Sequence, residues 1–516
     1  MLTKGDKKQI EAQGMSVETV EKQLQRFGKG FPQLNIVAPA TLENGILRQA
    51  DEEKKNYRTL YQKRQKTSKI FKFVPASGAA SRMFKKIYEI IDAFDGSEEK
   101  YLELLTDRSP NSIYYVCENI QDFAFFKRLE QICSEKGDCI NSKISKKDYV
   151  GALELIVSDK GLNYGNFPKG LIQFHTYKNE TRTSLEEHLA EGAMYAKSKK
   201  EVNIHFTVSP EFYDDFKAHI NDVIEKYEEQ FSVKYNIELS IQKKRTDTIA
   251  VDMDNNPAKN EDGQIVFRPG GHGALLENLK DIDADLIFIK NIDNVVTDRL
   301  KPTTVEYKEL LGGLLFDLKE KAHHYIGKLK AKEDITTGYL TKIGNFCQEK
   351  LNIDLPEKFK DQPDEDRIRI LFEHLNRPIR ICGMVKNEDE PGGGPFWVMD
   401  EKGEKSIQIV ESSQFDKTDK AQMKVFQSAT HFNPVDIACS IKDYENNQFD
   451  LSKFKDEETG FISEKTLKGR PIKALEHPGL WNGAMANWIT VFVEVPMDTF
   501  NPVKTINDLL RKEHRF

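Results

Sequence analysis

The feature that most constrains the fold is an alternation of apolar runs and helical patterns between residues 170 and 292. The apolar runs are short: GLIQFHT (170–176), VNIHFTVS (202–209) and LIFIKNI (286–292). Between them lie segments with helical spacing, such as TSLEEHLAEGAMYAKS and PEFYDDFKAHINDVIEKYEEQF. Strands that alternate with helices are typical of βαβ units. The sequence therefore predicts an α/β fold around a mostly parallel sheet.

The composition excludes several classes of protein. Hydrophobic residues make up 38% of the 516 residues and aromatic residues 10%, which excludes a disordered chain, and no run approaches the ~18 apolar residues of a membrane span. The net charge of −7 gives no basis for non-specific nucleic-acid binding. The N-terminus lacks an apolar signal-peptide core, and the six cysteines have no C-x-x-C spacing. We therefore expect reduced thiols and a cytoplasmic location.

The length predicts two to four structural units, since one domain takes ~100–200 residues. Shifts in pattern along the chain suggest where these units begin and end. We predict an N-terminal helical extension (1–68), an α/β core (69–299) with a helical insertion at about 86–160, a second helical insertion (300–378), and a strand-rich C-terminal part (379–516).

A strand-to-helix connection near residue 75 has an unusual composition. The apolar run IFKFVP (70–75) is followed by Ala76–Ser81, all Gly, Ala or Ser, and then by a helical pattern. Backbone N–H groups in such a turn can approach an anion closely, and Arg82 can add forked hydrogen bonds to phosphate oxygens. The alternative is a tight connection whose small residues only permit packing. The turn matches neither a P-loop nor a dinucleotide-binding fingerprint.

This turn resembles the signature turn of sugar-nucleotide pyrophosphorylases, in which a strand leads into G-G-x-G-T-R-[ML]. Here the segment 77–83 reads SGAASRM, with fewer glycines and Ser in place of Thr. Five further segments resemble motifs of the UDP-glucose and UDP-sugar pyrophosphorylase branch, in the same order. They are FPKGLIQF (167–174), RPGGHGALLENL (268–279), DLIFIKNIDNVV (285–296), KSIQIVESSQF (405–415) and TFNPVKTINDLL (499–510). The whole sequence also resembles a bacterial family of domains of unknown function.

The resemblance implies a glycosyltransferase-A-like fold: a mostly parallel mixed sheet with helices on both faces, helical insertions and a strand-rich C-terminal part. It also implies roles for particular residues. The resemblance assigns Arg82, Lys169 and Lys504 to catalysis, Ala76, Ser77, Gly78, Ala79, Gln242, Gly271, His272 and Gly273 to nucleotide binding, Asn294, Glu411 and Asn433 to sugar binding, and Asp293 to a metal ion.

Three of the charged residues, Lys169, Asp293 and Lys504, each have a plainer alternative. Lys169 can neutralise phosphates during transfer, because fixed cations stabilise phosphoryl-type transition states, or it is an exposed loop lysine. Asp293 follows an apolar strand, where open α/β sheets bind ligands, and one carboxylate suffices for Mg²⁺ with phosphates. Its alternative is an Asx turn that closes the strand. Lys504 either reaches the phosphates from a stem fixed by Pro502 or is a surface lysine.

The other candidates depend more on the resemblance. The Gly271–Gly273 backbone can lie against a flat base, with His272 fixing the loop, or it forms a hairpin-like turn before a helix. Gln242 corresponds to a residue that reads the base in the resembled family, although Gln is common at strand ends. Glu411 can bond sugar hydroxyls or face solvent, and Asn433 echoes a sugar-contacting Asn of that family.

We therefore predict a nucleotidyltransferase. An oxygen of a sugar 1-phosphate attacks the α-phosphorus of a nucleoside triphosphate, with UTP as the expected donor, and pyrophosphate leaves. Mg²⁺ is the expected cofactor, and no general base is needed because a sugar phosphate is already an anion. Two alternatives stay open: a non-catalytic nucleotide or nucleotide-sugar binding protein of the same fold, and a scaffold whose helical insertions bind a protein. We expect no nucleic-acid or membrane partner; the sugar and the oligomeric state stay open.

Overall fold

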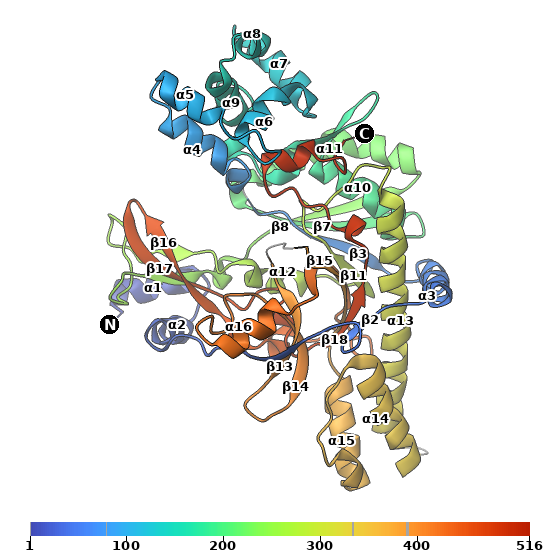
Figure 1. The fold of residues 1–516 in the computed structure, drawn as a ribbon. Coiled ribbons are helices and arrows are strands. Elements are labelled where there is room, and N and C mark those ends of the chain that lie inside the picture. The colour runs from blue at the N-terminus through green and yellow to red at the C-terminus, as the bar shows by residue number, and fades with distance from the viewer. Residues whose placement is uncertain (1, 79, 333–334, 389–391, 516) are drawn as a thin grey trace. The chain divides into compact units, whose positions relative to one another are not determined.

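The protein is a mixed α/β protein (Figure 1). The structure, a computed structural model, describes residues 2–78, 80–332, 335–388 and 392–515. The predicted α/β class is confirmed. Within these described ranges, no helix is both long enough and apolar enough to cross a membrane.

The chain divides into two compact units, and each draws on separate stretches of sequence. The units therefore divide the chain differently from the four predicted segments. Unit 1 comprises Met1–Phe71, Gln242–Ile289 and Lys308–Pro496, and unit 2 comprises Lys72–Ile241, Lys290–Tyr307 and Met497–Phe516.

The main sheet portion of unit 1 is mixed. Its strands lie in the order β2 (Ile46–Leu47), β18 (Ile489–Glu494), β12 (Ile379–Lys386), β15 (His431–Ser440) and β11 (Leu286–Ile289). β2 and β12 pair in parallel with β18, whereas β15 is antiparallel to both of its neighbours. β12 is buried at every position except its last, in keeping with its nearly continuous apolar sequence.

Strand β15 was not predicted from the sequence. All ten of its residues are buried, yet it contains Pro434, which cannot donate a ladder hydrogen bond and normally argues against a central strand. The register against β12 shifts between Gly383 and Val385, and Val435 has a left-handed φ of 57°. This bulge accommodates the proline inside the sheet.

Two smaller antiparallel sheets and several helices complete unit 1. One sheet has the order β1–β13–β14 and the other β10–β9–β17–β16. The strands are β1 (Asn35–Pro39), β13 (Gly394–Met399), β14 (Lys405–Val410), β9 (Thr248–Val251), β10 (Phe267–Arg268), β16 (Phe461–Leu467) and β17 (Arg470–Glu476). The helices are α1 (Lys4–Ala12), α2 (Val17–Lys29), α3 (Asp51–Arg64), α12 (Leu276–Leu279), α14 (Thr337–Leu351), α15 (Asp364–Leu375), α16 (Lys420–Gln427) and most of α13 (Lys301–Ala331).

Unit 2 begins within strand β3 (Ile70–Pro75) and contains a parallel pair of strands covered by helices. β7 (Glu201–Val208) pairs in parallel with β8 (Lys234–Ile241), and α10 (Ser184–Tyr195) and α11 (Tyr213–Phe231) pack against them. The short strands β6 (Lys197–Ser198), β4 (Gln173–Thr176) and β5 (Thr181–Thr183) complete the strands of this unit that the structure describes.

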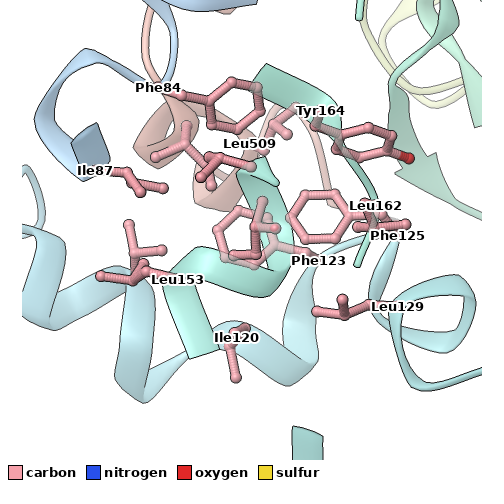
Figure 2. Close-up of a cluster of buried hydrophobic side chains, with 14 of the residues drawn as sticks. Phe84, Ile87, Ile120, Phe123, Phe125, Leu129, Leu153, Leu162, Tyr164 and Leu509 are labelled. Carbon is pink, nitrogen blue, oxygen red and sulfur yellow. The ribbon is translucent and has the colours of Figure 1, made fainter. Parts of the chain in front are cut away.

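The predicted helical insertion near residues 86–160 is a layer of short helices with its own core. Figure 2 shows this core, in which Phe84, Phe123, Phe125 and Leu153 gather around Leu509 from the C-terminal segment. The C-terminal segment is therefore anchored in this layer by hydrophobic burial. The helices are α4 (Lys85–Ala93), α5 (Glu98–Leu104), α6 (Ile113–Glu118), α7 (Phe126–Glu135), α8 (Ile140–Ser145) and α9 (Tyr149–Val157).

The strongest sequence patterns gave the correct elements. The apolar run 70–75 is strand β3, and the predicted helical region 300–378 contains α13, α14 and α15. The N-terminal region 1–68, predicted to be helical, also contains β1 and β2. These two strands are short, and neither has the clear alternation that would identify a strand from sequence alone.

Candidate functional site

Asp293 lies just beyond strand β11, on a segment that continues beside strand β3. The Lys290 N–H donates to the Phe73 carbonyl (3.2 Å), and the Ile292 N–H donates to the Pro75 carbonyl (3.3 Å). The Asp293 side chain is almost fully buried, with a residue exposure of 8%. Its position after a buried strand agrees with the place predicted from the sequence.

Two lysines from distant parts of the sequence lie against the Asp293 carboxylate. Lys169 Nζ is 2.8 Å from Asp293 Oδ2, and Lys504 Nζ is 3.8 Å from the same oxygen. Lys169 Nζ also donates to the Val503 carbonyl (2.6 Å). Burial would raise the pKa of Asp293, but the ammonium groups of Lys169 and Lys504 outweigh it and hold that pKa below its ordinary value. The carboxylate is therefore ionised at neutral pH.

The segment that carries Lys504 is fastened to the Asp293 turn by hydrogen bonds. Asn294 Oδ1 accepts from the Asn501 N–H (2.9 Å), and Asn294 Nδ2 donates to the Thr499 carbonyl (3.4 Å). The Val503 N–H donates to the Asp293 carbonyl (3.1 Å). Both ends of the Asn294 amide thus bind protein, and its predicted contact with a sugar stays a prediction.

The backbone of Lys504 is fixed while its ammonium remains accessible. The N–H groups of Lys504 and Thr505 both donate to Asp508 Oδ2, at 2.8 and 2.7 Å. The side chain of Lys504 is 53% exposed. A fixed stem with an exposed cation at its end suits contact with a substrate anion.

The small-residue turn after β3 is held next to the segment that carries Lys169. The Ala76 N–H donates to the Thr207 carbonyl (2.8 Å), and the Ala80 N–H donates to the Phe167 carbonyl (3.1 Å), two residues before Lys169. Ser77 accepts a hydrogen bond from Ser209 Oγ through its carbonyl (2.7 Å).

The turn also presents an exposed cation. Gly78 and Arg82 are exposed, and no described residue makes a hydrogen bond or ion pair with the Arg82 guanidinium. A Cβ added at Gly78 would meet nothing within 4 Å. Ala79, also predicted to bind nucleotide, lies outside the described residues. The geometry therefore leaves Arg82 free to meet a ligand.

In unit 1, the glycine loop 271–273 is closely packed. Gly271 has a φ of 75°, and a Cβ there would lie 2.7 Å from Glu476 Oε2. A Cβ on Gly273 would lie 2.0 Å from the Pro478 carbonyl oxygen. The backbone conformation therefore requires Gly271 and the packing of the loop requires Gly273, whatever ligand the loop contacts.

His272 and Glu411 are brought together by a residue that the sequence analysis did not identify, Trp481. The rings of His272 and Trp481 stack with centroids 4.2 Å apart, and the Trp481 side chain lies close enough to Glu411 to act on the pKa of its carboxyl group. The Leu480 N–H donates to His272 Nδ1 (3.0 Å), and burial lowers the pKa of His272 to about 4. His272 is thus neutral and holds the loop. Burial raises the pKa of Glu411.

The last two candidates of unit 1 are Asn433 and Gln242, and the Asn433 N–H donates to the carbonyl of Gly393, a residue that packs beside Glu411. Asn433 Oδ1 accepts from the Val435 N–H (3.1 Å), and Asn433 Nδ2 has no hydrogen-bond partner among the described residues. Gln242 Nε2 donates to Asp247 Oδ1 at 3.3 Å. No hydrogen bond joins Gln242 to the glycine loop among the described residues.

The candidate residues therefore form two groups, one in each unit. Lys169, Asp293, Asn294 and Lys504 meet in unit 2, with the small-residue turn beside them. In unit 1, His272 and Glu411 meet through Trp481. Trp481 is one of only three tryptophans in the chain, but nothing in its local sequence signals a link to residues 70 and 209 positions earlier.

The donor set around Asp293 was tested for its fit to Mg²⁺. The described residues contain no group of three or more His, Cys, Asp or Glu side chains arranged to hold a metal ion. Mg²⁺ takes only one or two carboxylates and completes its shell with water and substrate phosphates. The buried, ionised carboxylate of Asp293 therefore fits as a single protein ligand, and only in the presence of phosphate.

Solved structures of nucleotide-sugar enzymes are similar to this chain at a distance. UDP-glucose pyrophosphorylase from Leishmania major, in complex with UDP-glucose, matches with 12% identity and a TM-score of 0.44 over 99% of this chain and 79% of that chain. UDP-N-acetylglucosamine pyrophosphorylase from Trypanosoma brucei matches with 12% identity and a TM-score of 0.48, over 99% of this chain and 82% of that chain. Because both TM-scores are below 0.5, these similarities do not establish a function for this chain.

The family of the chain follows from its sequence. No curated protein is significantly similar to it. The model of one family, described as "Domain of unknown function (DUF4301)", matches residues 3–515, which is nearly the whole chain. The protein therefore belongs to the DUF4301 family.

Proposed function

We propose that this protein is a nucleotidyltransferase that joins a nucleoside triphosphate and a sugar 1-phosphate into a nucleotide sugar and pyrophosphate. One observation carries the proposal. Lys169, Asp293 and Lys504 come from three motifs that are 124 and 211 residues apart in sequence, and they meet at one carboxylate oxygen. The sequence resemblance assigns Lys169 and Lys504 to catalysis and Asp293 to a metal ion. A chance match of motifs would have no reason to place them together.

The proposed reaction is an in-line displacement at phosphorus. An oxygen of the sugar 1-phosphate forms a bond to the α-phosphorus, and the bond from that phosphorus to the bridging oxygen of the β-phosphate breaks. Pyrophosphate leaves with the electron pair of the broken bond. The attacking phosphate is already an anion near neutral pH, so no residue has to remove a proton.

The residues of unit 2 have separate tasks in this scheme. Lys504, on its fixed stem, neutralises charge that develops on the phosphates, and Arg82 binds the triphosphate with forked hydrogen bonds. Asp293 keeps Lys169 in place and would be the protein ligand of Mg²⁺. When bound, that ion supplies positive charge to the triphosphate. The protein contributes positioning and charge rather than covalent chemistry.

The finer assignments follow the resemblance alone. UTP is the proposed nucleotide, the Gly271–Gly273 loop the proposed contact of the base, and Glu411 and Asn433 the proposed contacts of the sugar. The proposed partners are thus small molecules: a nucleoside triphosphate and a sugar 1-phosphate.

Two specific observations favour a second function. The Asp293 carboxylate is already neutralised by two lysines, and the turn has fewer glycines than the pyrophosphorylase signature. A protein that binds a nucleotide or nucleotide sugar without catalysis would keep the same fold and tolerate both features.

The experiment that separates the two functions combines binding and turnover. The melting temperature is measured with UTP, ATP, CTP, GTP and dTTP in the presence of Mg²⁺, and pyrophosphate release is measured with each nucleotide and a panel of sugar 1-phosphates. A ligand that binds only the native state at 100 times its Kd stabilises it by ~2.7 kcal/mol. A rise in Tm with pyrophosphate release supports the enzyme, and a rise without release supports the binding protein. The absence of any rise contradicts both.

A further inference from the structure

Helix α10 is unusual because it buries charged side chains along one face. Eleven of its twelve residues are buried, including Glu186, Glu187, His188 and Glu191. Ser184, Glu187, His188 and Glu191 are spaced i, i+3, i+4 and i+7, so they lie on one face of the helix. Glutamate is almost never fully buried unless it is paired, so this face must bind specific partners.

The partners of this polar face lie on the segment that carries Asp293. Ser184 Oγ donates to the carbonyl of Ile292, the residue before Asp293, and His188 Nε2 donates to the same carbonyl (3.2 Å). Two donors on one carbonyl oxygen fix both the position and the direction of this peptide group.

The polar face also holds the segment on either side of Asp293. Lys290 Nζ donates to Glu191 Oε1 (2.8 Å), and Lys301 Nζ donates to Glu187 Oε2 (2.5 Å). Lys290 and Lys301 are both buried, with exposures of 1% and 0%. The polar face therefore binds the chain at Lys290 and Ile292, before Asp293, and at Lys301, after it.

Glu191 also binds strand β3, which leads to the small-residue turn (76–81). Its Oε2 accepts from Lys72 Nζ (2.8 Å) while its Oε1 accepts from Lys290 Nζ. Lys72 lies in β3, which ends directly before Ala76, and Lys290 lies three residues before Asp293. One carboxylate thus ties together the two stretches of chain that end in the proposed phosphate and metal residues.

The ionisation states agree with these contacts. Burial would raise the pKa of Glu191, but the ammonium groups of Lys290 and Lys72 outweigh it and hold that pKa well below its ordinary value. Burial, with a contribution from Lys72, lowers the pKa of His188 far below its ordinary value. His188 is therefore neutral, and the proton on Nε2 is the one that binds Ile292.

We propose that the polar face of α10, made of Ser184, Glu187, His188 and Glu191, positions Asp293 relative to the small-residue turn after β3. This proposal rests on the proposed function, because it gives these four residues a task in the same reaction. They touch no reacting atom, so they are positioning residues. Hydrophobic residues of the same volume often replace a buried charged network at no loss of stability, so stability alone does not account for this face.

Two variants test the positioning role by kinetics. Glu191→Gln removes the bridge, since a neutral amide cannot accept from two ammonium groups in the same way, and Ser184→Ala removes one donor to Ile292 with little change in volume. We expect kcat for pyrophosphate release to fall about 10- to 100-fold in both, because small misplacements in an active site have effects of that order. The KM for UTP should change much less.

A matched control separates positioning from stability. Glu309 is also buried and binds Arg58 and Gln62, but it belongs to unit 1 and makes no hydrogen bond or ion pair with the described residues of the Asp293 segment. Glu309→Gln should lower Tm as Glu191→Gln does and leave kcat of the folded protein unchanged. Should Glu191→Gln fail to fold, Ser184→Ala carries the test. Parental kcat in a folded Ser184→Ala protein would overturn the proposal.

A second readout does not need enzymatic activity. Burial protects the Lys169 amine from acylation, since its side chain is 13% exposed and its Nζ lies against Asp293 and the Val503 carbonyl. In Ser184→Ala, acetic anhydride should label Lys169 several times faster than in the parent, as measured by mass spectrometry, while the exposed Lys512 is labelled at the parental rate. Unchanged labelling of Lys169 contradicts the positioning role. If labelling changes but the parent protein shows no turnover with any nucleotide, the proposed function fails and the positioning of Asp293 stands.

Discussion

The two groups of candidate residues are built by different physical means. In unit 2, Lys169, Asp293 and Lys504 meet through charge, and their carboxylate stays ionised although it is buried. In unit 1, the loop at His272 is held by ring stacking on Trp481 and by glycines with no room for a side chain. The unit 2 group therefore has accessible charges that can bind a ligand, whereas the unit 1 group presents a rigid surface.

This difference predicts how each group responds to mutation. Removing a charge from the unit 2 group should change chemistry more than folding, since Lys504 and Arg82 are exposed. Filling space in the unit 1 group should change folding first, because the backbone there is in direct contact with its neighbours.

The largest effect is expected for Asp293→Asn. The amide is nearly isosteric, but it supplies no charge to Mg²⁺ or to Lys169, so Mg²⁺-dependent pyrophosphate release should fall below detection. UTP binding, measured by calorimetry, should persist. Undiminished turnover in this variant would exclude Asp293 as the metal carboxylate.

Lys504→Met should lower kcat by about 10²–10³, the range seen when one preorganised electrostatic group is removed from an active site. Affinity for UTP should fall much less, because the side chain is half exposed and acts mainly on the transition state. Steady-state kinetics beside Lys512→Met, a change at a lysine that is 89% exposed, gives the comparison. Equal turnover in both variants would show that Lys504 is not catalytic.

An element or site residue could be predicted from the sequence where its pattern is local. It could not be predicted where its structure depends on a residue far away in the sequence. Strand β3, the small-residue turn and the segment of Lys504 were found because each has a local pattern. Strand β15 was missed because Pro434 breaks the pattern of a central strand, and the bulge that accommodates it involves Gly383, 51 residues away. A local pattern contains no information about such a partner.

The polar face of α10 shows the same limit within the site. The spacing of Ser184, Glu187, His188 and Glu191 can be read from the sequence, but it looks like the solvent-exposed face of an amphipathic helix. Only the structure shows that lysines 72, 290 and 301 cover it. No local pattern marks these lysines as buried, since charged side chains are seldom buried.

In unit 1, Gly273→Ala should destabilise the protein by about 1–3 kcal/mol, because a Cβ would meet the Pro478 carbonyl oxygen at 2.0 Å and the backbone would have to move. The matched control is Gly327→Ala, in the interior of α13, where a Cβ meets nothing within 4 Å. That control should stabilise by about 0.5–1 kcal/mol. Chemical denaturation measures both, and equal stability of the two variants would contradict the close packing of the loop.

Arg82→Ala should weaken UTP binding about tenfold and leave Tm unchanged, since a hydrogen bond to a charged group contributes ~1.5–3 kcal/mol and this side chain is exposed. Calorimetry with UTP and a thermal melt without ligand measure the two quantities. A variant that unfolds, yet binds UTP normally when folded, would make Arg82 a structural residue.

The smallest effect concerns the protonation of His272. Its pKa of about 4 in the folded protein lies below the ordinary value of ~6.5 in the unfolded chain. As the pH falls, the unfolded state therefore binds the proton first, and the free energy of unfolding decreases. The stability due to neutral His272 is complete above pH ~6.5 and is lost as the pH falls toward 4. Between pH 7 and pH 6 the loss is ~0.7 kcal/mol. Urea denaturation of the parent and of His272→Gln at both pH values isolates this contribution, because the other titrating groups are common to both proteins. The same pH dependence in the two proteins would mean that burial in the loop does not hold His272 neutral.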